Sequence, residues 1–444
     1  MAEKDLANSA ANKGAGECGS NVACSKALVW ARSREIAAAL APASSAWSGD
    51  YPVIGGRDGV IALACSAPPK THEWRLDKRD ALLLLLLLQG SLIASSGGAP
   101  PPPYHGVDAT LRGLAGAAEG FGAASIGGLE GDTYPVTNLL DDGPGSLRYA
   151  AARDEPLWVV FNVSGTISLA SPLRVTSHKT IDGRGQRIKI TGNGLLLQSC
   201  EHVIVNNLEF ERGRGDAITI VADAKDVWID RCTLSDYNDG LIDITRRSTR
   251  VTVSRCHFYQ HKKTMLISAN PRHVGDRNIK VTIHHCYFDQ TQERHPRVRF
   301  AKVHLYNIYF REWGVYGVRA SVEAQIVSEH NVYEAGTSKR AFDYFIEKAP
   351  DSDIAVAGSI SSDGDVFLNG AEGPANSTAF LPEDYYSMNP KVHPAGKQLV
   401  RVIRETAGWQ NIPLPGSSSV KKSDSRFDEH HRCHHQASYC ATRS

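Results

Sequence analysis

The sequence predicts an all-β fold, a solenoid of parallel strands wound into a β-helix. One observation is a short hydrophobic pattern that recurs at a nearly constant interval through the middle of the chain. A second is that no segment with helical apolar spacing separates the copies, which excludes strand–helix–strand units. A third is the composition, 42% hydrophobic and 22% charged residues in 444, which is typical of a globular protein.

The recurring pattern has hydrophobic residues at its first, third, sixth and eighth positions. Its five copies are Val203–Phe210, Val227–Leu234, Val251–Phe258, Val281–Phe288 and Val303–Phe310. Their starts are 24, 24, 30 and 22 residues apart. Alternation within each copy predicts short strands with one buried face, and stacked copies of this length form a solenoid. The excess residues of the long interval, near 270–276, predict a loop on one face.

Three cysteines stand at the same place in successive copies. Cys232, Cys256 and Cys286 each occupy the sixth position. This register favours an internal stack of small apolar side chains, with a disulfide between two neighbours as the second choice.

The N-terminal part of the chain differs from the repeats. Residues 1–78 are rich in Ala and Ser and predict a low-complexity extension, with a mis-assigned start as the alternative to a native segment. Residues 79–99 contain the apolar run Ala81–Leu88 after two basic residues. This run is too short for a membrane span of about 20 residues, so it predicts a displaced secretory signal, with a buried helix as the alternative.

The folded body is expected over residues 108–411. Its first segment, 108–118, has helical apolar spacing and predicts a short N-terminal cap helix. Residues 412–444 predict a polar, disordered tail, because the spacing of its His and Cys residues fits no standard zinc finger.

Charge is balanced overall but unevenly distributed. Lys and Arg total 49 against 48 Asp and Glu, which argues against a protein that coats nucleic acid. Residues 216–243 contain seven aspartates, whereas residues 255–304 contain ten Lys and Arg. An acidic pole beside a basic strip indicates a bridging metal and a polyanionic substrate, such as a uronic-acid polymer.

The coil register predicts which charged residues meet. Counted from the first valine of each copy, Asp216, Asp239, Lys263 and Arg294 all lie at offset 12 or 13. Because neighbouring coils are about 4.8 Å apart, these side chains are expected in one row. Two carboxylates so close need a proton or a cation between them, and a cluster of oxygen ligands suits Ca²⁺.

Several segments resemble plant pectate lyases of polysaccharide lyase family 1. They are Trp228–Leu234, Asp239–Thr245, Val251–Ser254, Val281–Cys286 and Arg294–Phe300, supported by Glu119–Gly122, Asp142–Arg148, Thr180–Gly185 and Phe367–Ala371. The resemblance implies a right-handed parallel β-helix with long loops on one face, secretion to the cell wall, and calcium-dependent cleavage of polygalacturonate by β-elimination.

The resemblance also implies roles for single residues. Asp216, Asp239 and Asp243 match calcium-ligand positions of the family. Lys263 matches its substrate-binding lysine, Arg294 its catalytic base, and Arg299 a second arginine that binds a substrate carboxylate. Because arginine normally holds its proton, the alternative for Arg294 is a carboxylate clamp.

The sequence departs from the family pattern near these positions. Gly213-Arg214-Gly215 runs directly into Asp216, so three residues are missing, one of them an aspartate that normally helps to bind calcium. Lys262, Asn238 and Asn270 stand where acids are usual. Each change removes negative charge, so we expect weaker calcium binding than in typical relatives. The usual cysteine pair is replaced by Arg319 and His330.

The leading hypothesis is a secreted, monomeric pectate lyase that needs Ca²⁺ and acts on polygalacturonate, with no nucleic-acid partner and no membrane span. A polygalacturonate hydrolase on the same fold is the first alternative, because paired aspartates also serve as acid and base. A pectin-binding protein with weak or no activity is the second. Sequons at Asn162 and Asn376 predict glycosylation if the chain is exported.

Overall fold

Alternating β-branched residues build the walls of the fold. In β11 (Lys225–Asp230), Val227 and Ile229 point into the core and Trp228 points to the other face.

In the computed structural model, residues 62–63, 74–75, 111–375 and 377–415 are described. The first of its two compact units, 1–98, is described only by the paired strands β1 (Ala62–Leu63) and β2 (Trp74–Arg75). Residues 79–99, most of 1–78 and most of 412–444 lie outside the described residues.

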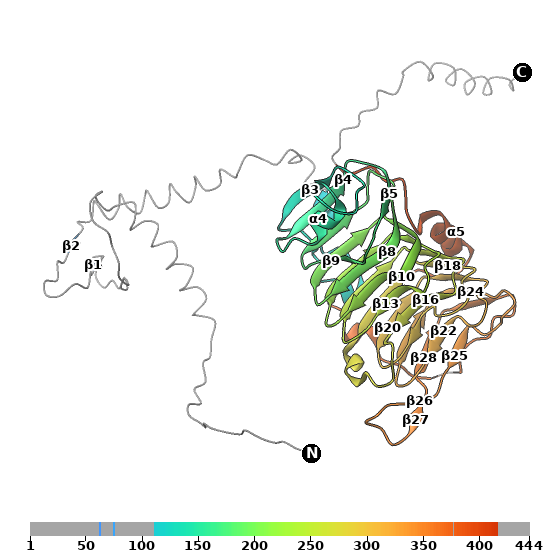
Figure 1. Cartoon of the computed structure of the whole chain (residues 1–444). Coiled ribbons are helices and arrows are strands. Elements are labelled where there is room, and N and C mark those ends of the chain that lie inside the picture. The colour runs from blue at the N-terminus through green and yellow to red at the C-terminus, as the bar shows by residue number, and fades with distance from the viewer. Residues whose placement is uncertain (1–61, 64–73, 76–110, 376, 416–444) are drawn as a thin grey trace, which may run out of the picture. The chain divides into compact units, whose positions relative to one another are not determined.

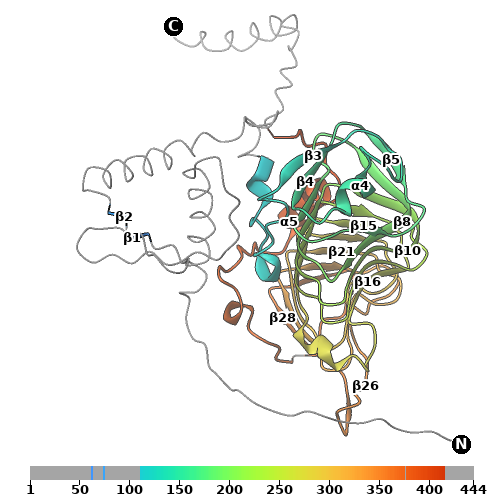
Figure 2. The ribbon, with the colours of Figure 1, turned by 60° about the vertical axis from the view of Figure 1, so that its left-hand side comes forward.

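One wall of the second unit is a ten-stranded parallel sheet (Figure 1). Its order is β28-β23-β20-β17-β14-β11-β9-β7-β4-β3. The bounds are β3 Asp132–Val136, β4 Leu157–Phe161, β7 Lys179–Asp182, β9 Glu201–Asn206, β14 Thr249–Ser254, β17 Lys280–His284, β20 Lys302–Tyr306, β23 Gln325–Glu329 and β28 Ser359–Asp363. Each strand pairs with the equivalent strand one coil away, and Figure 2 shows the same stack from another side.

Two further rows of strands close the solenoid. One row holds β5 (Gly165–Ser168), β12 (Thr233–Leu234), β15 (His257–Tyr259), β18 (Tyr287–Asp289), β21 (Tyr309–Arg311), β24 (Val332–Glu334) and β29 (Val366–Leu368). The other holds β6 (Leu173–Arg174), β13 (Gly240–Ile244), β16 (Lys263–Ile267), β19 (Arg297–Val298), β22 (Val318–Ala320) and β25 (Phe342–Tyr344). The long strands β8 (Ile188–Gln198) and β10 (Glu209–Val221) pair with members of both rows. The parallel β-helix predicted from the repeat is therefore confirmed.

Each predicted copy contains a corner between two strands. The corner residues adopt left-handed backbone angles, which turn the chain sharply within one residue. They are Asn207, Arg231, Arg255, His285 and Asn307, with φ of 60°, 51°, 50°, 54° and 51°. Equal corners on successive coils keep the strands in register.

Stacked side chains fill the interior. Phe258, Phe288, Phe310, Tyr333 and Phe367 form a continuous stack with ring centroids 4.5–5.3 Å apart. Cys232, Cys256 and Cys286 are buried free thiols, as the apolar-stack interpretation predicted and not the disulfide.

The N-terminal end is covered differently from the expectation for residues 108–118. Among residues 111–118, which the structure describes, the chain forms only a 3₁₀ turn, η1 (Arg112–Leu114), which contains Gly113 and is followed by Gly116 with φ 70°. Leu111 still packs against the outward Trp158. The helix that joins the core at this end is α4 (Leu147–Ala151), which Ser146 caps by accepting a hydrogen bond from Tyr149 N.

Other short elements cover the outside. In η2 (Gly120–Gly122), the backbone N–H of Phe121 donates to Thr282 Oγ1, and a Cβ at Gly120 would overlap Thr282. Helix α5 (Lys397–Thr406) packs Leu399 and Ile403 on Tyr287 and Tyr309. The remaining elements are η3 (Val274–Asn278), within the predicted long loop, η4 (Pro382–Asp384), and the hairpin β26 (Glu347–Lys348) with β27 (Ala355–Val356).

Of the two sequon asparagines, Asn162 lies exposed directly after β4, and Asn376 lies outside the described residues. Among the described residues, none of the helices has the length and apolarity needed to cross a bilayer.

Candidate active site

The strand row β10-β13-β16-β19 carries the predicted charged residues on successive coils. Asp216 lies in β10, Asp239 and Asp243 lie before and in β13, Lys263 begins β16, and Arg294 precedes β19. The register supports this alignment, because Gly240 pairs with Lys263 and Lys263 pairs with Glu293.

Asp216 is aimed by an irregularity in its strand. The pairing of β10 with β8 shifts register between Phe210 and Gly213 and again between Arg214 and Ile218. Such bulges redirect side chains and are common beside active sites. The irregular segment between Phe210 and Ile218 therefore sets the direction of Asp216.

Gly240 lies between two carboxylates. Its backbone N–H donates to Asp216 Oδ1 at 2.7 Å, and a Cβ at this position would lie 2.7 Å from Asp216 Oδ1 and 3.2 Å from Asp243 Oδ1. Only glycine leaves the oxygens of both aspartates room to approach the same point.

The environment of the two aspartates opposes their ionisation. Burial is the main cause that raises the pKa of Asp243 to about 7, and the Asp216 charge adds to it, while Arg294 and Lys263 act in the opposite direction. Burial also raises the pKa of Asp216, opposed by the Gly240 hydrogen bond. Among the described residues, neither carboxylate forms an ion pair, so Arg294 and Lys263 offset their negative charge only from beyond ion-pair distance.

The two cations of the row are held differently. Lys263 Nζ donates to Asp239 Oδ1 at 2.7 Å. Arg294 has φ 68°, and its carbonyl accepts from Met265 N at 2.8 Å, which fixes it beside β16. Its Nε is buried and has no hydrogen-bond partner among the described residues. Arg294 is thus the cation of this row that is available to a ligand.

Arg299 is bonded to residues outside this row. Its guanidinium donates to both carboxylate oxygens of Glu347 at 2.7 and 2.9 Å, and to the carbonyls of Ser268 and Ala269 at 3.1 and 3.2 Å. The side chain is 7% exposed. The structure therefore joins Asp216, Asp239, Asp243, Lys263 and Arg294, and ties Arg299 to the β26 hairpin.

Sequence reasoning missed three contributors to this region. Gly240 supplies the N–H and the space described above. His261 Nε2 lies 3.1 Å from the carbonyl of Asp239, and burial lowers the pKa of this histidine, which favours its neutral form. Glu347 binds Arg299 across 48 residues. The Asp239-Gly240 dipeptide was a local signal, whereas nothing local connects Glu347 to Arg299.

The residues present fit a calcium ion in part. Asp216, Asp239 and Asp243 offer oxygen donors alone, which is the chemistry that Ca²⁺ prefers. Ca²⁺ takes 6–8 oxygens. One oxygen of Asp239 is already bonded to Lys263, so solvent and substrate would have to supply much of the shell.

The sequence of this chain matches a known protein family. The family model described as pectate lyase matches residues 161–411, which includes the whole row. The chain belongs to the pectate lyase family. "Putative pectate lyase 21" of Arabidopsis thaliana is 36% identical over 283 residues, covering 59% of this chain and 72% of that protein. The chain is therefore an enzyme of the pectate lyase class.

Solved pectate lyase structures share the fold. The 1.7 Å crystal structure of Jun a 1, the major cedar pollen allergen, superposes with a TM-score of 0.61 at 31% identity, covering 68% of this chain and 96% of that one. The pectate lyase Bsp165PelA from Bacillus sp. N165, solved in complex with trigalacturonate, gives a TM-score of 0.54 at 23% identity, covering 66% and 98%. The second likeness bears on the fold alone.

Proposed function

We propose that this pectate lyase family member cleaves polygalacturonate by calcium-dependent β-elimination, giving 4,5-unsaturated oligogalacturonides outside the cell. The observation that carries the proposal is the close pair of carboxylates Asp216 and Asp243 beside Gly240, with Arg294, whose Nε has no hydrogen-bond partner among the described residues, in the same row. A uronate polymer bears one carboxylate on each sugar, so it complements both a bound cation and a free guanidinium. The trigalacturonate in the Bacillus relative is a ligand of this class.

Each residue has a distinct part in the proposed reaction. Asp216, Asp239 and Asp243 would hold the ion, which when bound neutralises the substrate carboxylate and acidifies the neighbouring C–H. Lys263 orients Asp239 through their ion pair. Arg294 removes the proton α to the carboxylate; the C–H electrons form the C4–C5 double bond, the bond to the glycosidic oxygen breaks, and that oxygen takes up a proton. Arg299, the substrate-binding position implied by the family resemblance, would act only after release from Glu347.

A second candidate is a binding protein with little activity. It is favoured by the absent aspartate before Asp216 and by the bond that occupies Asp239. A hydrolase that uses Asp216 and Asp243 as acid and base remains the third hypothesis, since the Asp243 pKa near 7 also suits a proton donor.

One assay on the purified chain separates the three. With polygalacturonate and excess Ca²⁺, a lyase gives a product with a conjugated double bond that absorbs in the ultraviolet, and chelation stops it. A hydrolase gives reducing ends without that absorbance, and a binding protein gives neither. Reducing ends that appear in chelator without ultraviolet absorbance would overturn the proposal.

A further inference from the structure

The outer side of the ten-stranded sheet carries a row of polar side chains that the reaction does not use. Lys280, Lys302, Gln325 and Ser359 begin β17, β20, β23 and β28, and they pair in register along the sheet. Because side chains alternate along a strand, these four point outward while Val281, Val303, Ile326 and Ile360 fill the core. The row thus crosses four coils along the solenoid axis.

The two lysines are unusual neighbours. Like charges directly opposite each other on paired strands destabilise a sheet. Among the described residues, neither Lys280 nor Lys302 forms an ion pair or a hydrogen bond through its ammonium group, whereas most arginines of this sheet and its corners are paired with aspartates. Burial, with Lys302 and Arg250 nearby, lowers the pKa of Lys280. An anion at this point would remove the repulsion.

An aromatic ring stands over both ammonium groups. Tyr385 has its ring centroid 5.9 Å from Lys280 Nζ and 6.0 Å from Lys302 Nζ, yet it is 44% exposed. Phe121 and Phe380 pack against the ring and hold it in place. An exposed, fixed ring beside cations offers an apolar face to a sugar ring and charge to its carboxylate.

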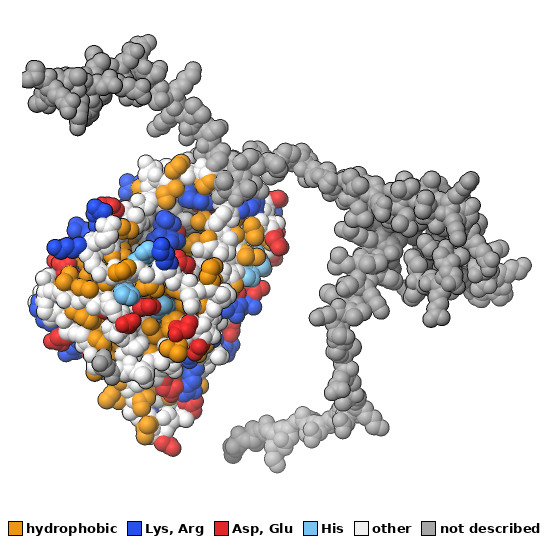
Figure 3. All heavy atoms as spheres, turned by 180° about the vertical axis from the view of Figure 1, so that it is seen from behind, with side chains coloured by type: hydrophobic (Ala, Val, Ile, Leu, Met, Phe, Trp, Pro, Cys, Tyr) orange, Lys and Arg blue, Asp and Glu red, His pale blue; other side chains and the backbone are white. Residues whose placement is uncertain are grey.

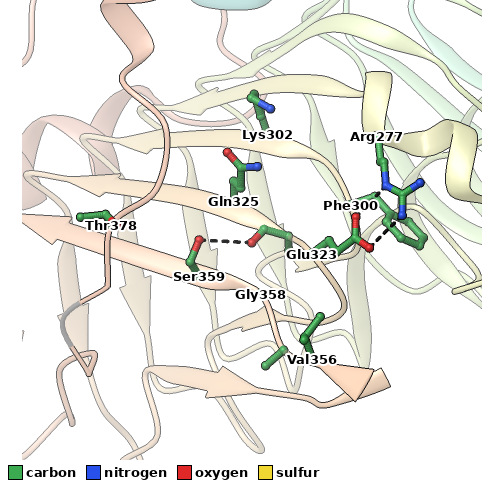
Figure 4. Close-up of a pocket in the computed structure, with 11 residues that line it drawn as sticks. Arg277, Phe300, Lys302, Glu323, Gln325, Val356, Gly358, Ser359 and Thr378 are labelled. Carbon is green, nitrogen blue, oxygen red and sulfur yellow. Dashed lines mark hydrogen bonds and ion pairs between the residues drawn. The ribbon is translucent and has the colours of Figure 1, made fainter. Parts of the chain in front are cut away.

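Three residues of the row also line a hollow, and Lys280 lies beside it on the next strand, paired with Lys302. Lys302, Gln325 and Ser359 lie side by side on three strands in Figure 4, within an open cavity of about 600 Å³. Arg277, bound to Glu323, and Val356 line one side, and Thr378 lines the other. This volume is in the range of small-molecule and sugar sites. On the face of the molecule in Figure 3, charges of both signs are interspersed.

We propose that this groove is a second binding site for an acidic polysaccharide chain, with Lys280 and Lys302 contacting uronate carboxylates and Tyr385 stacking on a sugar ring. The choice of a polyuronate as ligand rests on the proposed function; the site itself rests on the groove. It lies on a different wall from the aspartates and contains no carboxylate cluster, so its binding needs no Ca²⁺. It would retain the polymer near the enzyme between cleavage events.

The test measures calcium-independent binding by calorimetry. A galacturonate oligomer is titrated into the full-length protein in chelator, where cleavage stops. The double variant Lys280→Gln/Lys302→Gln is compared with the control Arg401→Gln/Arg404→Gln, which removes the same charge from the exposed side of α5. We expect at least a tenfold loss of affinity in the first and no change in the control. Circular dichroism verifies that both variants fold.

Two further arms test the chemistry. Tyr385→Ala should weaken binding and Tyr385→Phe should keep it, and a fully methyl-esterified oligomer, which lacks charge, should not bind. Absence of chelator-resistant binding by the natural protein, equal affinity in the lysine variant, or equal binding of the esterified oligomer would each overturn the inference. Ultraviolet product formation with Ca²⁺ is scored separately, so failure of the proposed reaction is distinguished from failure of the groove.

Discussion

Arg294 combines a fixed backbone with a guanidinium that lacks a partner at Nε. If it removes the proton, Arg294→Lys should reduce ultraviolet product formation by about 10²–10⁴-fold, because lysine cannot place a nitrogen at the same point. The fold should be unaffected. Arg272→Lys, an exposed arginine in the 270–276 loop, is the matched control and should retain full activity. Wild-type rates in Arg294→Lys would remove this residue from the mechanism.

Asp243 tests the metal site. Asp243→Asn keeps the size of the side chain and removes the charge, so the Ca²⁺ concentration for half-maximal activity should rise by about tenfold or more. Asp236→Asn, an exposed aspartate seven residues earlier, should leave it unchanged. Equal calcium dependence of both variants would contradict the assigned ligand set.

The calcium affinity depends on the number of carboxylates that are free to bind the ion. Because one of the three carboxylates, Asp239, is bonded to Lys263, we expect the chain to bind Ca²⁺ more weakly than typical relatives do. Calorimetric titration with Ca²⁺ alone, beside the cedar pollen protein, measures this difference. Equal or tighter binding by this chain would show that the lost charge is replaced elsewhere.

At the scale of elements, the β26 hairpin is coupled to the β19 region through the ion pairs of Glu347. Glu347 accepts from Arg299 and, at 3.3 Å, from Arg297, and side chains of the pair are 13% and 7% exposed. Neutralising one partner of a buried pair leaves the other charge without compensation, so Glu347→Gln should lower the free energy of unfolding by about 3 kcal/mol.

A surface pair provides the comparison for this variant. Glu201→Gln removes the same charge from the pair with Lys225, whose side chains are 37% and 44% exposed, and should change the free energy of unfolding by less than about 1 kcal/mol. Urea unfolding measures both. Equal effects would mean that the hairpin is not anchored through Arg299.

At the scale of the whole molecule, buried histidines lower the free energy of unfolding at acid pH. Burial lowers the pKa of His285 to about 4 and of His295 to about 3, and that of His284 well below its usual value. Because the unfolded chain takes up protons below about pH 6.5 and the folded chain resists them, stability falls as the pH drops from 6.5 towards 4. In the middle of this window, where the unfolded histidines are protonated and the folded ones are not, the slope approaches about 1.4 kcal/mol per pH unit for each histidine.

Urea unfolding between pH 4 and 7.5 checks this linkage. His285→Gln should reduce the dependence of the free energy of unfolding on pH, by up to the equivalent of one proton taken up on unfolding. His273→Gln, in the loop before η3, should leave this dependence unchanged. An unchanged slope in His285→Gln would show that this histidine is protonated equally in both states.

The sequence by itself determined the winding and the alignment of the charged row. Equal spacing of the copies requires strands that pair coil upon coil, so Asp216, Asp239, Lys263 and Arg294 fell at one offset and lie on neighbouring strands. The cysteine stack followed from the same period. These features are repeated along the chain, and a repeat transmits local register over long distances.

Only the tertiary structure determined the contacts between segments that do not repeat. Glu347 meets Arg299, Tyr385 meets two lysines and η2 meets Thr282 because distant segments pack on the solenoid, and no interval in the sequence records those contacts. The cap likewise moved from 108–118 to α4, since Gly113 and Gly116 interrupt a helix that spacing alone allowed. Side-chain pairing between non-repeating segments depends on three-dimensional proximity, which only the folded chain defines.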